Sequence, residues 1–183
     1  MNSRLPFFDA DSATRLENAR HPYPVVSLFS GAMGLDLGLN EAGLRVAVSQ
    51  DMDKWCIETM RRNSHLAIDG DIRDLIESDP SCEFFLQASG VTREALFAVV
   101  GGPPCQPFST AGKRKGVEDA RGQLYQEFIK VVSALPPRFF IMENVKGLAS
   151  MPCDPADKQS KPVLDTILES FKAIGYHTVH GIL

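Results

Sequence analysis

The chain has 183 residues, of which 44% are hydrophobic and 23% charged, a composition typical of a globular domain. Its 19 basic and 23 acidic residues give a net charge of −4, which argues against a strongly basic, stand-alone nucleic-acid-binding protein. No stretch approaches the roughly 18 apolar residues of a membrane-spanning helix, and the N-terminus does not resemble a secretion signal. We therefore expect a cytoplasmic protein with no membrane segment.

The cysteines Cys56, Cys82, Cys105 and Cys153 are widely spaced, and none belongs to a C-x-x-C pair. The four histidines also lack ligand spacing relative to these cysteines. The sequence therefore predicts no metal site, and free thiols are expected in a cytoplasmic protein.

Residues 1–22 are predicted to be an N-terminal extension, and residues 23–183 a single domain in which strands alternate with helices. Short apolar runs predict strands at 25–29, 45–50, 66–68, 97–100, 139–142 and 176–183. Helical spacing of apolar residues, with glycines placed to end two of the helices, predicts helices at 35–42, 53–63, near 75–76, at 123–135 and at 163–174. Residues 78–96 are predicted to hold one or two helical turns and a loop, and polar or glycine-rich composition predicts loops at 105–122 and 150–162.

Strands that alternate with helices predict an α/β fold, with a doubly wound, mostly parallel sheet covered on both faces. In such folds, ligands bind at the carboxyl ends of the strands. The unusual residues of this chain follow its predicted strands, at 29–34, 51, 71, 103–105 and 143–144. We therefore expect a functional site at this edge of the sheet.

The first strand is followed by F-S-G-A-M-G-L-D-L-G at residues 29–38. Glycines allow a ligand to approach the backbone, and the helix that follows favours negative charge at its N-terminus. The glycine spacing is not G-x-G-x-x-G, which disfavours a nicotinamide-dependent dehydrogenase. A plain tight turn is an equally good interpretation of this segment alone.

Two acidic residues follow the second and third predicted strands. Asp51 is placed about 20 residues after the glycine turn, where an acid can hold ribose hydroxyls, or it is a surface acid or helix cap. Asp71 either accepts a hydrogen bond from an adenine amino group or caps the next helix.

The most specific segment is G-G-P-P-C-Q-P-F-S at residues 101–109. Prolines restrict the backbone and would hold the thiol of Cys105 on a rigid turn at the end of a strand. This composition disfavours the alternative of an ordinary buried cysteine.

A second polar pair follows the predicted strand at 139–142. Residues 139–145 read F-F-I-M-E-N-V, so Glu143 and Asn144 come directly after a strand predicted to be buried. Burying polar groups there is costly unless they have a functional role or cap a helix.

These segments resemble, in order and spacing, the motifs of the DNA (cytosine-5) methyltransferase family. The matching segments are F-S-G-A-M-G-L (29–35), S-Q-D-M-D-K (49–54), G-D-I (70–72), G-P-P-C-Q-P-F-S (102–109), D-A-R-G-Q-L-Y (119–125) and E-N-V (143–145). The resemblance covers about residues 25–183 and implies the Rossmann-like fold of S-adenosylmethionine-dependent methyltransferases.

The resemblance implies a binding site for S-adenosylmethionine, in which Phe29 and Met52 pack on the adenine and Asp51 binds the ribose. The residues implied at this cofactor site are Phe29, Ser30, Gly31, Ala32, Gly34, Leu35, Asp51, Met52, Asp71, Ile72, Pro104 and Leu124.

The resemblance also implies that the Cys105 thiolate adds to C6 of a cytosine flipped out of DNA, which activates C5 for methylation. Glu143 would contact N3 of the same ring. Gln106, Ser109, Asn144 and the basic cluster at 113–115 would approach the DNA. The expected partner is DNA, in a monomeric, nucleoid-associated bacterial protein of restriction-modification type.

Three features depart from the family pattern. Met33 stands where the family usually has a glycine, and Asp51 where glutamate is commoner; we expect some adjustment of the turn and a shorter reach to the ribose. The sequence ends at Leu183, before the last strands, the target-recognition region and the final helix expected of the family. We expect these 183 residues alone neither to methylate DNA nor to recognise a sequence.

Two alternatives to a DNA (cytosine-5) methyltransferase remain open. One is a tRNA cytosine-5 methyltransferase, and the other is a non-catalytic, methyltransferase-like partner subunit.

Overall fold

The computed structural model describes residues 23–104, 124–153, 157 and 159–183. Within this part, five strands form one parallel sheet in the order β3-β2-β1-β4-β5. The strands are β1 (Pro24–Leu28), β2 (Arg45–Asp51), β3 (Ala67–Asp69), β4 (Ala98–Gly101) and β5 (Phe139–Met142). The prediction of a doubly wound, mostly parallel sheet is confirmed. The predicted extension at residues 1–22 lies outside the described residues.

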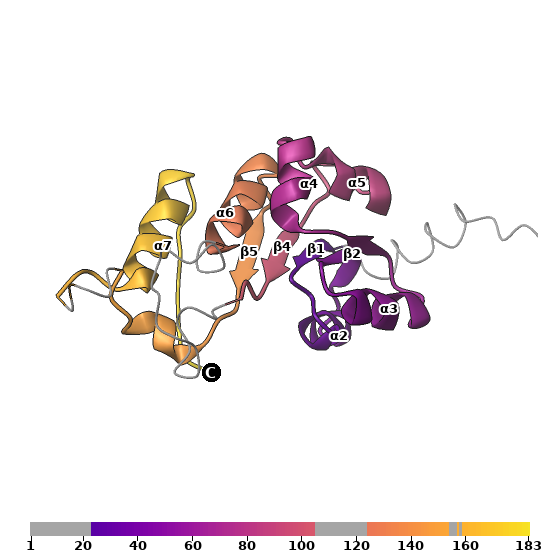
Figure 1. Ribbon diagram of the computed structural model, residues 1–183. Coiled ribbons are helices and arrows are strands. Elements are labelled where there is room, and N and C mark those ends of the chain that lie inside the picture. The colour runs from indigo at the N-terminus through magenta and orange to yellow at the C-terminus, as the bar shows by residue number, and fades with distance from the viewer. Residues whose placement is uncertain (1–22, 105–123, 154–156, 158) are drawn as a thin grey trace, which may run out of the picture.

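Helices cover both faces of the sheet (Figure 1). They are α2 (Gly34–Glu41), α3 (Lys54–Arg62), α4 (Ile72–Ser78), α5 (Glu83–Ser89), α6 (Leu124–Ala134), α7 (Val163–Ala173) and a 3₁₀ turn, η3 (Lys146–Ala149). The segment 78–96, predicted to hold one or two helical turns and a loop, contains the seven-residue helix α5.

The core has two sides because alternate strand residues point to opposite faces of the sheet. Val26, Leu28 and Val99 belong to a large apolar cluster with residues of α4, α5, α6 and α7. Val25 and Val100 pack with Leu39 of α2 on the other face. All five residues of β1 are buried, as expected for a central parallel strand covered on both sides.

Polar residues are also buried between β1, β2 and α2. The carboxylate of Asp36, completely buried in the first turn of α2, accepts hydrogen bonds of 2.6 Å from both Ser27 and Ser49. The hydroxyl of Ser30 in turn donates to that of Ser27 at 2.8 Å. This network connects the first two strands to the turn that follows β1.

Two expectations about the far side of the sheet are wrong. The strand at 139–142 was expected to be buried, but Phe139 and Ile141 are 57% and 43% exposed because β5 lies at the edge of the sheet. The strand expected at 176–183 does not form, and this segment is irregular. Residues 176–181 line a cavity of about 730 Å³ together with β5 and α7.

Candidate functional site

The turn after β1 adopts an unusual backbone conformation. Phe29, Gly31 and Met33 all have positive φ angles, of 54°, 55° and 71°. Positive φ is rare for residues other than glycine, so the surroundings must hold Phe29 and Met33 in this backbone conformation. The side chain of Met33 is buried against Ile57 and Met60, and this packing stabilises the left-handed residue. The left-handed conformation is therefore compatible with methionine at this position.

The carboxylate of Asp51 fixes the turn to the end of β2. Its Oδ2 accepts a hydrogen bond from the backbone N–H of Gly31 at 2.8 Å, and its Oδ1 accepts one from Asp53 at 2.9 Å. A carboxylate has about four acceptor positions, so these two bonds leave capacity for a ligand. The adjacent Met52 is 62% exposed and presents apolar surface at the same end of the strand.

Asp71, after β3, caps α4 by accepting a hydrogen bond from the backbone N–H of Arg73 at 2.9 Å. The Arg73 guanidinium also binds this carboxylate, and its hydrogen bonds lower the pKa of Asp71. The capping alternative for Asp71 is thus confirmed, and contact with an adenine remains a prediction. The neighbouring Ile72 is buried, so its side chain is part of the core.

The ends of β4 and β5 lie side by side. The side-chain amide of Asn144 donates to the carbonyl of Pro103 at 2.9 Å, and Glu143 donates from its backbone N–H to Gly101 at 3.0 Å. A Cβ at Gly102 would lie 3.0 Å from Oε2 of Glu143, so the carboxylate lies directly against this glycine. The acid and amide after β5 therefore lie beside the turn that leads to Cys105.

Gly101, at the end of β4, has no room for a side chain. A Cβ at this position would lie 2.5 Å from the backbone oxygen of Leu28, closer than real contacts allow. Any side chain would push β4 away from β1 just before the proline turn. Gly101 thus keeps the end of β4 close to the glycine turn that follows β1.

The predicted site residues that the structure describes lie at or next to the carboxyl edge of the sheet. Leu124, the first residue of α6, is buried in the same apolar cluster as Ile72. Pro104 is exposed. Cys105, Gln106, Ser109 and the basic cluster at 113–115 lie outside the described residues.

Sequence reasoning missed Gln50, a buried amide at the end of β2. Its Oε1 accepts a hydrogen bond from the Phe29 N–H at 3.4 Å, and its Nε2 donates one to the Gly70 carbonyl at 2.7 Å. The available signal was a glutamine shortly after the apolar run at 46–48, directly before the predicted ligand-binding acid. A buried polar side chain in a sheet generally has a defined hydrogen-bonding role.

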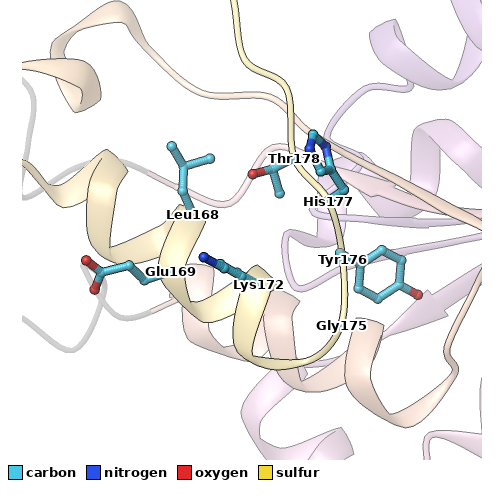
Figure 2. Close-up of a pocket in the computed structure, with 7 residues that line it drawn as sticks. All are labelled: Leu168, Glu169, Lys172, Gly175, Tyr176, His177 and Thr178. Atoms are coloured by element: carbon cyan, nitrogen blue, oxygen red, sulfur yellow. The ribbon is translucent and has the colours of Figure 1, made fainter.

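Two cavities lie away from these residues. Figure 2 shows one of about 490 Å³ between α7 and residues 175–178, lined by Leu168, Glu169, Lys172, Gly175, Tyr176, His177 and Thr178. Neither this cavity nor the one beside β5 is lined by a predicted site residue. Among the described residues there is no cluster of three potential metal ligands, and no helix is long and apolar enough to cross a membrane.

Comparison with known proteins finds Type II methyltransferases among the relatives of this chain. The Type II methyltransferase M.AquIA of Picosynechococcus sp. is 38% identical over 86% of this chain, and M.NgoPII of Neisseria gonorrhoeae is 35% identical over 85%. The chain spans 64% and 41% of the lengths of these two relatives.

Two solved structures are similar. A prophage-encoded Escherichia coli protein described as a DNA modification methyltransferase is 27% identical, with a TM-score of 0.58 over 82% of this chain and 38% of that one. The Dnmt2 methyltransferase of S. pombe is 21% identical, with a TM-score of 0.50 over 83% and 39%, and shows the fold alone. The family model for C-5 cytosine-specific DNA methylases matches residues 23–183, and the chain belongs to that family.

Proposed function

We propose that this chain carries the cofactor-binding and catalytic residues of an enzyme that transfers a methyl group from S-adenosylmethionine to C5 of cytosine in DNA. The hydrogen bond from Asn144 to Pro103 gives the strongest support, because it holds the acid-bearing segment after β5 against the turn that leads to Cys105. A nucleophile and an acid can act on one ring only if their segments are held together in this way.

The described residues fit S-adenosylmethionine. A Cβ added at Gly31 or Gly34 would meet no heavy atom within 4 Å, so there is open space over the turn. Asp51 retains acceptor capacity for ribose hydroxyls, and exposed Met52 offers apolar surface for an adenine. The cofactor, when bound, supplies an electrophilic methyl group.

The protein's own residues would prepare the cytosine. C5 is a weak nucleophile until the Cys105 thiolate bonds to C6 and the displaced electron pair makes C5 enamine-like. Glu143 would hold or donate a proton at N3 and so stabilise the charge that develops on the ring. After methylation, loss of the C5 proton and expulsion of the thiolate would restore the aromatic ring. The target base must first be flipped out of the duplex.

Calorimetric titration with S-adenosylhomocysteine tests the cofactor site. We expect saturable binding that Asp51→Ala weakens at least tenfold, since the substitution removes the acceptor that holds the Gly31 backbone. Asp69→Ala is the matched control, because Asp69 is an exposed acid at the end of the neighbouring strand. Equal weakening by both substitutions, or no binding by the unsubstituted protein, would contradict the proposed cofactor site.

Trapping on DNA that contains 5-fluorocytosine tests the catalytic role. We expect a covalent adduct at Cys105 that Cys105→Ser abolishes and Cys82→Ser preserves. The chain spans 64% of M.AquIA, so we propose that it forms the adduct only when the C-terminal region of a relative is added in trans. Adduct formation by the chain alone would contradict the expected inactivity, and tRNA methylated in preference to DNA would favour the alternative substrate.

A further inference from the structure

Gln50 connects the ends of the two strands that flank β2. The side chain is 1% exposed, and both ends of its carboxamide form hydrogen bonds. Phe29, which donates to it, directly follows β1, and Gly70, which accepts from it, directly follows β3. One side chain therefore joins two backbone segments that lie on opposite sides of its own strand.

Both connected segments have backbone conformations that side chains rarely adopt. Phe29 has a φ angle of 54° and Gly70 one of 151°. Such conformations persist only when surrounding contacts hold them. The carboxamide of Gln50 supplies one such contact to each segment.

Backbone hydrogen bonds place Gln50 in the same structural unit as the predicted cofactor residues. The N–H of Ser30 donates to the carbonyl of Gln50 at 3.1 Å, and the N–H of Gly70 donates to that of Asp51 at 3.1 Å. The turn after β1 and the loop after β3 are thus both attached to residues 50–51. The side chain of Gln50 adds a direct connection between them.

We propose that Gln50 is a positioning residue for the adenosine half of the cofactor, which sets the separation between the segments at 29–31 and 70–72. The inference rests on the proposed function, because these segments contact a ligand only if S-adenosylmethionine binds there. Gln50 does not touch the ligand itself, since its side chain is buried and its polar atoms are engaged by the protein.

The position requires a side chain with a donor and an acceptor. In Gln50→Glu the ionised carboxylate has similar size, but it places a second acceptor against the Gly70 carbonyl. In Gln50→Met the volume is similar and both hydrogen bonds are lost, which leaves the partner groups at Phe29 and Gly70 without the side chain's bonds.

The test compares ligand affinity with fold stability. S-adenosylhomocysteine and 5′-methylthioadenosine, which share the adenosine part, are titrated by calorimetry, with the emission of Trp55, the only tryptophan, as a second signal. We expect both substitutions to weaken both ligands by ten- to one-hundredfold at pH 7.5. For Gln50→Glu the affinity should recover as the pH is lowered towards 5, because the protonated acid again has a donor, whereas the unsubstituted protein should show no such gain.

Asn40→Ala is the matched control. The Asn40 amide accepts a hydrogen bond from the Val46 N–H at 2.9 Å near the start of β2, away from the carboxyl edge. It should lower stability in urea without changing ligand affinity. If the Gln50 variants keep full affinity and lose only stability, the positioning role is wrong while the proposed function stands. If the unsubstituted protein binds neither ligand, the cofactor site fails and the inference fails with it.

Discussion

The side-chain amide of Asn144 donates to the carbonyl of Pro103 at 2.9 Å, although the two residues are 41 positions apart. The oxygen of the same amide accepts the N–H of Val145 at 2.9 Å. Because both ends of the amide are engaged, it fixes the segment after β5 to the proline turn after β4. A direct DNA contact by Asn144, expected from the family resemblance, would have to coexist with this structural role.

Replacing Asn144 by alanine should therefore loosen the proposed catalytic edge. Loss of a part-buried hydrogen bond costs about 1 kcal/mol, which lowers the melting temperature by about 2–4 °C in a protein of this size. With the C-terminal region of a relative added in trans, adduct formation on 5-fluorocytosine DNA should slow at least tenfold, while affinity for S-adenosylhomocysteine stays unchanged. Asn63→Ala, which removes an exposed amide hydrogen bond to Thr59, is the control. The same small effect from both substitutions would show that the Pro103 contact has no special role.

Met33→Gly tests whether burial or backbone strain dominates at the glycine turn. Glycine would relieve the φ of 71°, worth about 1–2 kcal/mol, but it would remove a methionine side chain that is 4% exposed. Emptying such a site costs about 2–5 kcal/mol, so we expect a net loss of stability in urea unfolding.

Ser64→Gly is the matched comparison for Met33→Gly. Ser64 has a φ of 56° but lies on the surface. Strain relief and the greater freedom of the unfolded chain should nearly cancel there, within about 0.5 kcal/mol. A stabilised Met33→Gly variant would show that strain is the larger effect at the turn.

Periodicity and glycine placement predicted β1 to β5 and the helices α2, α3, α6 and α7 to within one residue, because apolar runs mark strands such as β1 and β4, whose residues are all buried. The helices α4 and α5 were predicted only as short helical turns. The sheet order is a tertiary property, and it determines which strand lies at an edge. For this reason the exposure of Phe139 and Ile141 and the absence of pairing by residues 176–183 were not predicted.

For the candidate site, sequence predicted the strand-end positions of Asp51, Asp71 and Glu143, but not their partners. The role of Gln50 depends on β1 and β3 lying on either side of β2, and that of Asp36 on two serines from neighbouring strands. Such contacts between distant segments leave no local pattern in the chain. Gly31, 20 residues before Asp51, was likewise not foreseeable as its partner, whereas capping of α4 by Asp71 was one of the two predicted roles of that acid.

The ion pair between Asp71 and Arg73 should make stability depend on pH. Hydrogen bonds from Arg73 hold the pKa of Asp71 below its ordinary value of 3.8. A lowered pKa in the folded state means that ionised Asp71 stabilises the fold above about pH 3.8, and that this contribution is lost as the pH falls through the lower, folded-state pKa. Arg73 is 44% exposed, so solvent screening limits the contribution to about 1 kcal/mol or less.

Urea midpoints measured from pH 6 to pH 2.5 check this ion pair. Arg73→Gln should lower stability at pH 6, and the difference from the unsubstituted protein should shrink below pH 3.8. In an Asp71→Asn background the same substitution should have little effect at any pH. A constant difference across the range would exclude ionisation of Asp71 as the cause.

Thiol reactivity should distinguish Cys105 from the other cysteines. Cys82 is fully buried, and burial raises its pKa to about 11. Burial, followed by the charges of Asp51 and Asp53, also raises the pKa of Cys56. Because the thiolate is the reactive form, about one Cys82 thiol in a thousand would be ionised at pH 8 even if the reagent could reach it.

The proposed chemistry needs an activated thiolate at Cys105, so brief iodoacetamide treatment of the native protein at pH 8, followed by peptide mass mapping, should label Cys105 first. Burial should leave Cys82 unlabelled. In urea, where burial is lost, Cys56 and Cys82 should react at similar rates. If Cys82 reacts as fast as Cys105 in the native protein, then Cys105 lacks the activation that the proposed chemistry needs, because its thiolate would have no advantage over that of a core cysteine.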